Sequence, residues 1–476
     1  MESSRARHVV VVGGGITGLA AAYQLSLLGG PGLRVTVLEA AAQIGVKLVV
    51  SDVAGLPVDA GAESMLTRRP EALALTRAVG LGASIVHPAT TGASVWSRGS
   101  LRPLPGGQLM GIPGDLRAVA ASGVLSLPGL LRIPLDQLLP RTRVSGDVSI
   151  GGFVRARLGR EVVDRLVEPL LGGVYAGHAD EISLDAALPQ LSAAVRGERS
   201  LLRAVREALP RPGAGPTGPV FGSVRGGLGL LPAAVAKASG AEIRTGEPVR
   251  ELRQTADGWQ LVVGSTRSRR TVEADAVVLA IPAAPAARLL ADLVPAAAAE
   301  VSGIEYASVA VITVALPSSD ATPAMTGTGF LVPPVEGRLI KAATYSSAKW
   351  GWLATATPEL MVLRASVGRF REERDLQRDD AELVTGALSD LADATGLAGP
   401  LLDSRVTRWG GSLPQYAVGH LDRVDRIRRA VATLPGLAVC GAAYDGVGIP
   451  ACVASGQEAA TQVLRTVAVT GQWSHG

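Results

Sequence analysis

The sequence predicts an α/β (α+β) protein in which both ends of the chain build one parallel sheet. Near the N-terminus, within residues 8–39, a run of four valines leads through a glycine-rich turn into a helix. The same order of strand, glycine loop and helix returns at Leu437–Leu464. Between the two, residues 101–209 alternate helix-like stretches with proline and glycine. These patterns predict parallel strands joined by right-handed crossovers, with a helical domain inserted between them.

Composition excludes several classes of protein. The chain has 476 residues, of which 47% are hydrophobic, so a globular protein of two or three domains is expected. The net charge is only +4 and no dense basic run occurs, so nucleic acid is not an expected partner. No uncharged apolar run reaches about 18 residues and no signal peptide is visible, which favours the cytoplasm. The two cysteines, Cys440 and Cys452, predict neither a disulfide framework nor a metal site.

The N-terminal motif is typical of a Rossmann-like dinucleotide-binding unit. The expected strand, glycine turn, helix and second strand lie at Val9–Val12, Gly13–Gly18, Leu19–Leu28 and Arg34–Glu39. Gly13, Gly15 and Gly18 match G-x-G-x-x-G, which allows a tight turn, a close approach to pyrophosphate and helix packing. Glu39 ends the second strand, where a carboxylate accepts hydrogen bonds from a ribose.

Hydrophobic patterning predicts the remaining elements. Alternation within Val50–Ser64 indicates a hairpin, and near-helical spacing of apolar residues indicates a helix over Ile150–Leu171. The proline- and glycine-rich segment Arg211–Ser223 predicts the loop that leaves the helical domain. A helix is expected at Arg225–Ala238, with strands in three stretches between residues 240 and 283, at Ala307–Leu316 and at Leu360–Val367.

The course of the chain after Glu39 indicates which dinucleotide binds. An NAD-dependent dehydrogenase would usually continue with further strand–helix–strand units. This chain enters a hairpin and the stretch VDAGAES (Val58–Ser64), and returns to the strand–glycine–helix pattern only near its C-terminus. A unit assembled from both chain ends suits a buried, elongated cofactor, so a flavoprotein with FAD is predicted.

Several segments together resemble the protoporphyrinogen/coproporphyrinogen oxidases of the amine-oxidase-like FAD superfamily. The superfamily features are GGGITGLAAAY, Glu39, VDAGAES, RTGEPVREL and ADAVVLAIPA. The more specific segments are RRPEAL, EPLLGGVYAG, the Lys349–Trp350 pair, LPQYAVGH and GVGIPAC. Within the family the chain is most similar to the actinobacterial type, a coproporphyrinogen III oxidase of haem biosynthesis.

The resemblance implies an FAD-dependent, oxygen-using oxidation of coproporphyrinogen III to coproporphyrin III, with release of hydrogen peroxide. The flavin would carry out the chemistry, so no protein residue is expected to be catalytic, and hand-over of product to a ferrochelatase is an expected partnership. The alternative within the family is a protoporphyrinogen IX oxidase. A flavin amine oxidase, which would need an aromatic pair beside the flavin, and a non-catalytic flavin- or porphyrin-binding protein also remain open.

The resemblance also implies which residues bind FAD. The glycine turn would hold the pyrophosphate, the end of the second strand the adenosine ribose, and Val249 the adenine through its backbone. The stretch after the hairpin and the start of the last helix would lie beside the flavin ring. The full set is Gly13, Gly14, Gly15, Ile16, Thr17, Gly18, Glu39, Ala40, Lys47, Gly61, Ala62, Glu63, Ser64, Val249, Val447, Gly448 and Ile449.

One segment departs from the family pattern. After the glutamate the family usually has an arginine and a Gly-Gly pair, whereas this chain reads EAAAQIGVKLVV. Gln43 stands in the place of the arginine and Val46 in the place of the second glycine. Lys47 follows, and a contact between its positive charge and the cofactor phosphates is expected.

The substrate candidates are cationic residues that suit carboxylate arms. Arg68, Arg69 and Arg102, with Lys341, are the candidates for holding propionates, because guanidinium groups bind carboxylates through two parallel hydrogen bonds. An ordinary surface charge remains the alternative for each arginine. Two further candidates, Tyr175 and Gly177, are expected at the wall of the substrate cavity, where a small residue leaves room for a flat macrocycle.

Three interleaved domains are expected. The FAD-binding domain would comprise residues 1–66, 222–300 and 430–476, and a substrate-binding sheet domain residues 67–100 and 301–429. Residues 101–221 would form the inserted helical domain. The preferred interpretation is that this domain covers the active site, while peripheral membrane contact through apolar positions in 109–135 is the alternative.

Overall fold

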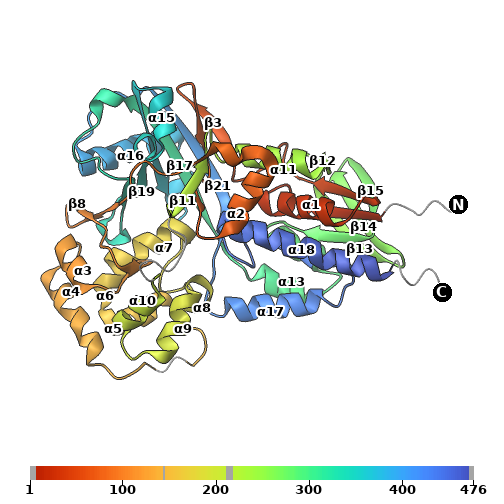
Figure 1. Ribbon diagram of the computed structural model, residues 1–476, viewed down its shortest axis with the longest axis horizontal. Helices are drawn as coiled ribbons and strands as arrows, with labels where there is room; N and C mark the ends of the chain where they lie inside the picture. The colour runs from red at the N-terminus through yellow and green to blue at the C-terminus, as the bar shows by residue number, and fades with distance from the viewer. Residues whose placement is uncertain (1–6, 143–144, 211–217, 471–476) are drawn as a thin grey trace.

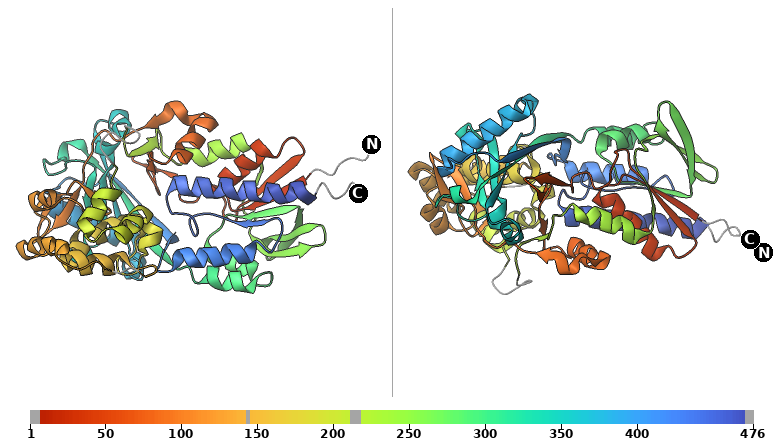
Figure 2. Two further views of the ribbon diagram at one scale, coloured as in Figure 1. Left: turned by 60° about the horizontal axis from the view of Figure 1, so that its bottom comes forward. Right: turned by 90° about the horizontal axis from the view of Figure 1, so that it is seen from above.

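A computed structural model describes residues 7–142, 145–210 and 218–470. Figure 1 shows a parallel sheet with its helices on the right, a large second sheet at the upper left and a cluster of helices at the lower left. Both views in Figure 2 keep the yellow helical cluster and the green strands β13–β15 at opposite ends of the molecule. The mixed α/β fold class predicted from the sequence is confirmed.

Both ends of the chain meet in a five-stranded parallel sheet. From edge to edge its strands are β12 (Glu242–Arg244), β2 (Leu33–Leu38), β1 (Arg7–Val12), β16 (Ala276–Leu279) and β22 (Leu437–Val439). Each strand pairs in parallel with its neighbours. The four consecutive valines lie in β1, the central strand.

Burial on both faces explains why β1 is a continuous hydrophobic run. Val9 and Val11 pack in the cluster that includes α1 (Ile16–Leu28) and α18 (Ile449–Thr470). Val10 and Val12 pack in the cluster on the other face. That face is covered by β13 (Val249–Thr255), β14 (Gly258–Ser265), β15 (Ser268–Ala274), α12 (Ala283–Leu290), α13 (Pro295–Ser302) and α17 (His420–Val431).

A seven-stranded, mostly antiparallel sheet forms the second layer. Its order is β21 (Asp403–Pro414), β17 (Tyr306–Pro317), β20 (Leu360–Val367), β19 (Ile340–Tyr345), β18 (Gly329–Leu331), β7 (Ser94–Ser97) and β8 (Ser100–Pro103). Only the β18–β7 pair is parallel. One face packs against α16 (Asp380–Thr395) around a core of aliphatic residues from β17, β19 and β20. The strands predicted at Ala307–Leu316 and Leu360–Val367 are confirmed.

Helices between residues 116 and 208 pack around a separate hydrophobic core. They are α3 (Leu116–Ser122), α4 (Leu127–Arg132), α5 (Ile150–Leu158), α6 (Arg160–Val162), α7 (Glu168–Tyr175), α8 (Leu184–Ala187), α9 (Pro189–Gly197) and α10 (Leu201–Ala208). The prediction of a continuous helix over Ile150–Leu171 is wrong. Gly159 adopts φ +99°, which breaks the α-helix, and a π-helical turn at Val163–Val167 separates α6 from α7.

Short elements connect these layers. The predicted hairpin is confirmed as β3 (Val50–Val53) and β4 (Leu56–Asp59). In the predicted loop Arg211–Ser223, residues 211–217 lie outside the described part. Its end is a strand, because β11 (Phe221–Val224) pairs with β5 (Met65–Leu66) and β6 (Ile85–Val86). The remaining short elements are α2 (Pro70–Thr76), β9 (Gln108–Leu109), β10 (Ile112–Pro113), α11 (Leu230–Ser239), α14 (Ser346–Lys349) and α15 (Gly351–Ala356).

Candidate functional site

The turn between β1 and α1 has the shape that a pyrophosphate-binding loop requires. Gly13 adopts φ +111°, and a Cβ on Gly18 would lie 2.0 Å from the Gly13 carbonyl oxygen. At Gly15 the nearest atom to an added Cβ would be a Val46 methyl group 3.9 Å away. The helix begins at Ile16, three residues earlier than predicted, so its N-terminus and free N–H groups lie directly at this open turn.

Glu39 lies next to the same turn. Its Oε2 accepts a hydrogen bond from the Gly14 N–H at 2.6 Å, and its Oε1 accepts one from the Ala41 N–H at 2.7 Å. A carboxylate has about four lone-pair sites, so both oxygens retain capacity for ribose hydroxyls. Because the Glu247 N–H donates to the Glu39 carbonyl, the start of β13 with Val249 is held beside it, as predicted for the adenine end.

The N-terminus of α18 lies beside that of α1. A Cβ on Gly456 would approach the Thr17 carbonyl oxygen to 2.2 Å, so only glycine allows this close crossing. Figure 1 shows α1 and α18 running side by side away from the centre of the molecule. The structure therefore brings the predicted residues of the first helix together with Val447–Ile449, more than 400 residues later in the chain. Both helix N-termini lie at the carboxyl ends of the parallel strands, where α/β sheets bind their ligands.

The loop after the hairpin is fixed to the seven-stranded sheet by a buried ion-pair cluster. Glu63 accepts from Lys349 Nζ at 2.5 Å and from Arg364 Nη1 at 2.7 Å. Arg364 Nη2 also donates to the carbonyl of Gly61 at 2.5 Å. Burial alone would raise the pKa of Glu63, but the two cations outweigh it and lower the pKa to about 2. Sequence reasoning gave no role to Lys349 and did not consider Arg364.

The segment that departs from the family pattern lies against this loop. A Cβ on Gly61 would be 2.0 Å from the Lys47 carbonyl oxygen, so the two backbones touch. The Lys47 ammonium donates to the Ser412 carbonyl at 2.5 Å, and its contact with the cofactor phosphates stays a prediction. Val46 adopts φ +50°, a left-handed conformation that is strained for a β-branched residue.

The arginine candidates for the substrate do not form one cluster. Arg68 is exposed. Arg69 pairs with Glu71 at 2.7 Å at the start of α2, and Arg102 on β8 donates from Nε to the Ser97 carbonyl at 3.0 Å. These contacts place the arginines in two parts of the molecule, so they do not define a substrate site by themselves.

The remaining three candidates lie where α7 covers the seven-stranded sheet. Lys341 on β19 is buried, and its Nζ donates to the Gly368 carbonyl at 2.8 Å. Tyr175 is buried at the end of α7, with its ring 5.6 Å from that of Tyr416. A Cβ on Gly177 would lie 2.1 Å from Gln415 Oε1, so this glycine allows close packing against that side chain, and its place at the cavity wall stays a prediction.

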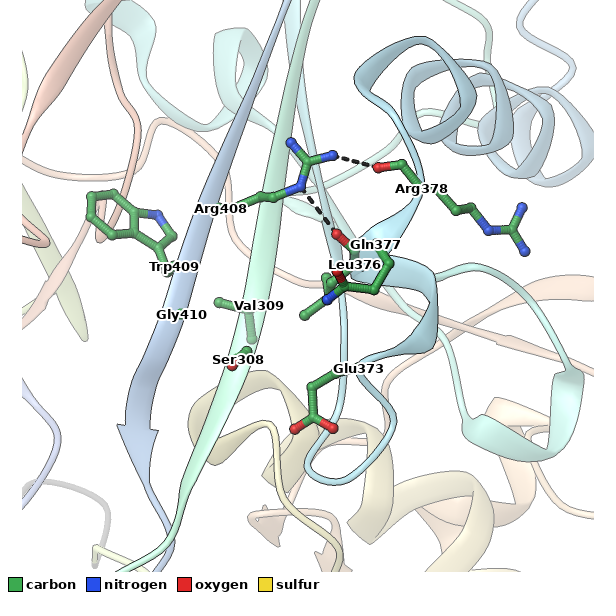
Figure 3. Close-up of a pocket in the computed structure, with 9 residues that line it drawn as sticks. All are labelled: Ser308, Val309, Glu373, Leu376, Gln377, Arg378, Arg408, Trp409 and Gly410. Carbon is green, nitrogen blue, oxygen red and sulfur yellow. Dashed lines mark hydrogen bonds between the residues drawn. The ribbon is translucent and has the colours of Figure 1, made fainter. Parts of the chain in front are cut away.

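A pocket of about 320 Å³ lies at the edge strand of the seven-stranded sheet. Figure 3 shows Arg408 turned toward the carbonyl groups of Leu376 and Arg378, while Trp409 lies on the other side of β21. The Trp409 indole donates to the Ala60 carbonyl at 3.1 Å, so this strand also contacts the loop that precedes Gly61. The pocket contains no residue predicted to bind cofactor or substrate.

The described residues contain neither a metal-binding cluster nor a membrane-spanning helix. Within residues 7–142, 145–210 and 218–470, no group of three or more His, Cys, Asp or Glu side chains is placed to hold a metal ion. Across the same ranges, no helix is both long enough and apolar enough to cross a membrane. Cys440 and Cys452 are both buried and unbridged.

Replacing Glu63 with glutamine should destabilise the protein strongly. The change leaves Lys349 and Arg364 buried without their anion, which costs about 3 kcal/mol for a buried pair. Urea denaturation at pH 7 measures the loss. Glu251→Gln, which removes an exposed partner of Arg253, is the control and should cost less than about 1 kcal/mol.

The Glu63→Gln variant should also change how the free energy of unfolding depends on pH. Because the folded-state pKa of Glu63 is depressed from 4.5 to about 2, its contribution is present above pH 4.5 and is lost as pH falls toward 2. The difference in unfolding free energy between wild type and Glu63→Gln should therefore shrink over this interval. A difference that is constant with pH would contradict the assignment.

Val46→Gly should stabilise the protein, since glycine adopts φ +50° without steric strain. The expected gain is about 1 kcal/mol in thermal or urea unfolding, reduced by the greater flexibility of glycine in the unfolded chain. Gly197→Ala tests the opposite substitution at the end of α9, where an added Cβ meets no atom, and should change stability little. A clear loss of stability in Val46→Gly would show that Val46 is not strained.

Comparisons with known proteins agree with this geometry. The chain matches the profile of the family described as flavin containing amine oxidoreductase over residues 16–464. It is 39% identical over 465 residues to the coproporphyrinogen III oxidase of Mycobacterium tuberculosis (strain ATCC 25618 / H37Rv), an alignment that covers 97% of this chain and 98% of that protein. Identity to the coproporphyrinogen III oxidase of Bacillus subtilis (strain 168) is 33% over 470 residues, an alignment that covers 96% of this chain and 98% of that protein.

A solved structure matches over the same length. The crystal structure of a protein from Exiguobacterium sp. 255-15, provisionally named a protoporphyrinogen oxidase, superposes with a TM-score of 0.84 at 32% identity, covering 97% of this chain and 99% of that chain. The alignments with these relatives and with this structure cover 96% to 97% of the chain and so include both ends that form the parallel sheet. The chain belongs to the family of flavin-containing amine oxidoreductases and is a flavin-dependent oxidoreductase.

Proposed function

We propose that the protein is a coproporphyrinogen III oxidase that uses FAD and oxygen. The observation that carries the proposal is the full-length similarity to relatives of that name, at 39% and 33% identity. The reaction would convert coproporphyrinogen III to coproporphyrin III and release hydrogen peroxide. The dinucleotide site supports the same conclusion. It is built from both ends of the chain, and the similarity to these relatives extends over both ends.

The residues at the glycine turn fit FAD better than a mononucleotide flavin. The turn is open at Gly15, and a helix N-terminus faces the place where a pyrophosphate would bind. Glu39 offers two carboxylate oxygens to an adenosine ribose, and Val249 lies beside it for the adenine. The second helix N-terminus, at Val447–Ile449, would support the flavin ring. A mononucleotide would leave the ribose site at Glu39 without a ligand.

The protein's own part in the reaction is to position and enclose. A bound flavin would supply a hydride acceptor for a bridging carbon of the porphyrinogen, with loss of a pyrrole proton, and would be reoxidised by oxygen to give hydrogen peroxide. Glu63, held by Lys349 and Arg364, fixes the loop of residues 61–64 beside the flavin end of the site. The α7 helix and the face of the seven-stranded sheet that it covers would exclude water from the macrocycle. We also propose the domain division predicted from the sequence.

A protoporphyrinogen IX oxidase is the second candidate. The provisional name of the Exiguobacterium structure favours it, but its identity of 32% is lower than that of the Mycobacterium relative. The two substrates differ in charge, because protoporphyrinogen IX carries two vinyl groups in place of two propionates. Cationic groups at the substrate site would therefore favour coproporphyrinogen III.

Anaerobic mixing of the oxidised flavoprotein with coproporphyrinogen III tests the function. Hydride transfer should bleach the flavin absorbance near about 450 nm, and admission of oxygen should restore it with formation of peroxide. The rate should exceed that with protoporphyrinogen IX in a parallel experiment. A faster reaction with protoporphyrinogen IX would favour the second candidate, and no bleaching with either substrate would indicate a non-catalytic binding protein.

We further propose that the helical region touches a membrane surface from the cytoplasmic side. Four leucines on α4 and the 3₁₀ turn after it (Ile133–Gln137) follow at intervals of four, four and three residues, which places them on one helical face. They are 45% to 76% exposed: Leu127, Leu131, Leu135 and Leu138. Contiguous exposed apolar side chains of this kind are typical of interaction surfaces. Hand-over of product to a ferrochelatase stays a prediction of the family resemblance.

Flotation with phosphatidylglycerol vesicles tests the membrane contact. The wild-type protein should float, and the double variant Leu127→Gln/Leu131→Gln should lose most of this binding because about two leucine side chains no longer enter the lipid. The matched control is Leu27→Gln/Leu28→Gln, which removes two leucines of similar exposure from α1. Equal flotation of both variants would contradict the proposal.

A further inference from the structure

Two buried cations beside the end of α7 have no anionic partner. Lys341 is 6% exposed and Arg369 is 9% exposed, and each hydrogen-bonds only to a backbone carbonyl. Lys341 Nζ donates to Gly368 at 2.8 Å, and Arg369 Nη2 donates to Val332 at 3.0 Å. Within the described part of the chain, no carboxylate lies within ion-pair distance of either group. Buried cations are normally paired, so this arrangement calls for an explanation.

The backbone holds the two cations side by side. The Val332 N–H donates to the Lys341 carbonyl at 2.9 Å, while the Val332 carbonyl accepts from Arg369. Gly368 accepts from Lys341 and directly precedes Arg369. The turn that carries Arg369 is rigid, because Gly368 adopts φ +97° and Arg371 φ +62°, and because the Glu372 N–H donates back to the Arg369 carbonyl.

Most hydrogen-bond donors of the pair are unused. A guanidinium has five N–H donors and an ammonium has three, and one of each is used here. Arg364 Nε is fully enclosed without a partner, whereas Nε and Nη1 of Arg369 are not among the enclosed unpartnered atoms of the described residues. The free donors of Arg369 therefore border solvent-accessible space.

Among the described residues, no carboxylate in contact compensates the charge of either side chain. Burial first, and then the neighbouring Arg369, lower the pKa of Lys341 to about 7. Burial also lowers the pKa of Arg369, while Glu372 and Glu168 oppose this from beyond ion-pair distance. Glu168 accepts from the Ala179 N–H at 3.1 Å, and Glu372 faces His178 at 3.6 Å. Both carboxylates are thus engaged elsewhere.

The pair lies on β19 and just after β20, the strand of Arg364, which contacts the loop at the proposed flavin end of the site. Arg364, which holds Glu63, is on β20 opposite Thr344 of β19. Arg369 comes five residues after Arg364 and just beyond the end of β20, so the two lie at most about 17 Å apart along the chain. There the Phe370 N–H donates to the Ala176 carbonyl at 2.7 Å, which places the pair against the end of α7.

We propose that Lys341 and Arg369 together bind one carboxylate arm of the tetrapyrrole substrate. Two adjacent, preorganised cations with free donors match a carboxylate, whose two oxygens accept several charge-assisted hydrogen bonds. The proposal rests on the proposed function, and it adds Arg369 to the single candidate Lys341 that sequence reasoning placed here. A bound carboxylate would favour the protonated form of Lys341 and offset the cost of burying the Arg369 charge.

Binding of coproporphyrin III to the flavin-loaded protein, followed by porphyrin fluorescence, tests the proposal without turnover. Lys341→Met and Arg369→Met should each weaken binding by about tenfold, since each removes charge-assisted hydrogen bonds to the arm. The tetramethyl ester of coproporphyrin III, which lacks the charge, should bind the wild type and both variants equally. Lys237→Met, on the exposed face of α11, should bind both porphyrins like the wild type.

The melting temperature of the porphyrin-free protein separates binding from folding. Because each methionine variant removes a buried unpaired charge, it should melt at the same temperature as the wild type or higher. Variants that melt lower and bind coproporphyrin III with unchanged affinity would assign the pair a structural role and overturn the proposal. A wild-type protein that binds no coproporphyrin III and oxidises no coproporphyrinogen III would instead overturn the proposed function, and this proposal with it.

Discussion

The close crossing of α1 and α18 is the constraint on which the rest of the structure depends. Gly456 lies so near the Thr17 carbonyl oxygen that any side chain there would push the helices apart. This contact packs the first turn of α1 against α18 about two turns after α18 begins, and both helices begin at the carboxyl edge of the parallel sheet. A dinucleotide needs two such positions, one for its pyrophosphate and one for its ring system, and neither end of the chain supplies both.

The second connection runs from this site to the seven-stranded sheet. Glu63 is buried between Lys349 and Arg364, and Lys47 reaches Ser412 on β21. Both links are made of charged or polar groups in a buried setting, where their geometry is well defined and their loss is costly. They hold the loop beside the flavin end in register with the sheet face that continues toward Lys341. Cofactor and substrate regions are therefore positioned relative to each other by a few directional contacts.

Short sequence patterns predicted the elements whose structure depends on neighbouring residues in the chain. The valine run, the glycine spacing and Glu39 indicated the dinucleotide unit, because each reflects a requirement of the turn itself. The strand Leu360–Val367 was predicted with its observed bounds, since a short apolar run between turns has few alternatives. The helix over Ile150–Leu171 was predicted as continuous because its apolar spacing hides the break at Gly159.

Contacts between distant residues could not be predicted in this way. Lys349 and Arg364 are 286 and 301 residues from Glu63, so no local spacing relates them. The close contact between Gly177 and Gln415 could not be predicted either, because the two residues are far apart in the chain. Lys341 was selected for its charge alone, and its partner Arg369 emerged only from the fold. Candidate cofactor-binding residues could be predicted from sequence motifs, whereas candidate substrate-binding residues could be identified only from contacts in the fold.

A crystal structure of the flavin-loaded protein with coproporphyrin III tests the central claim that both ends of the chain build one site for a single dinucleotide. The account predicts FAD with its pyrophosphate at the N-terminus of α1, its ribose at Glu39 and its ring system beside Val447–Ile449. A cofactor that contacts only one of the two helix N-termini would contradict it.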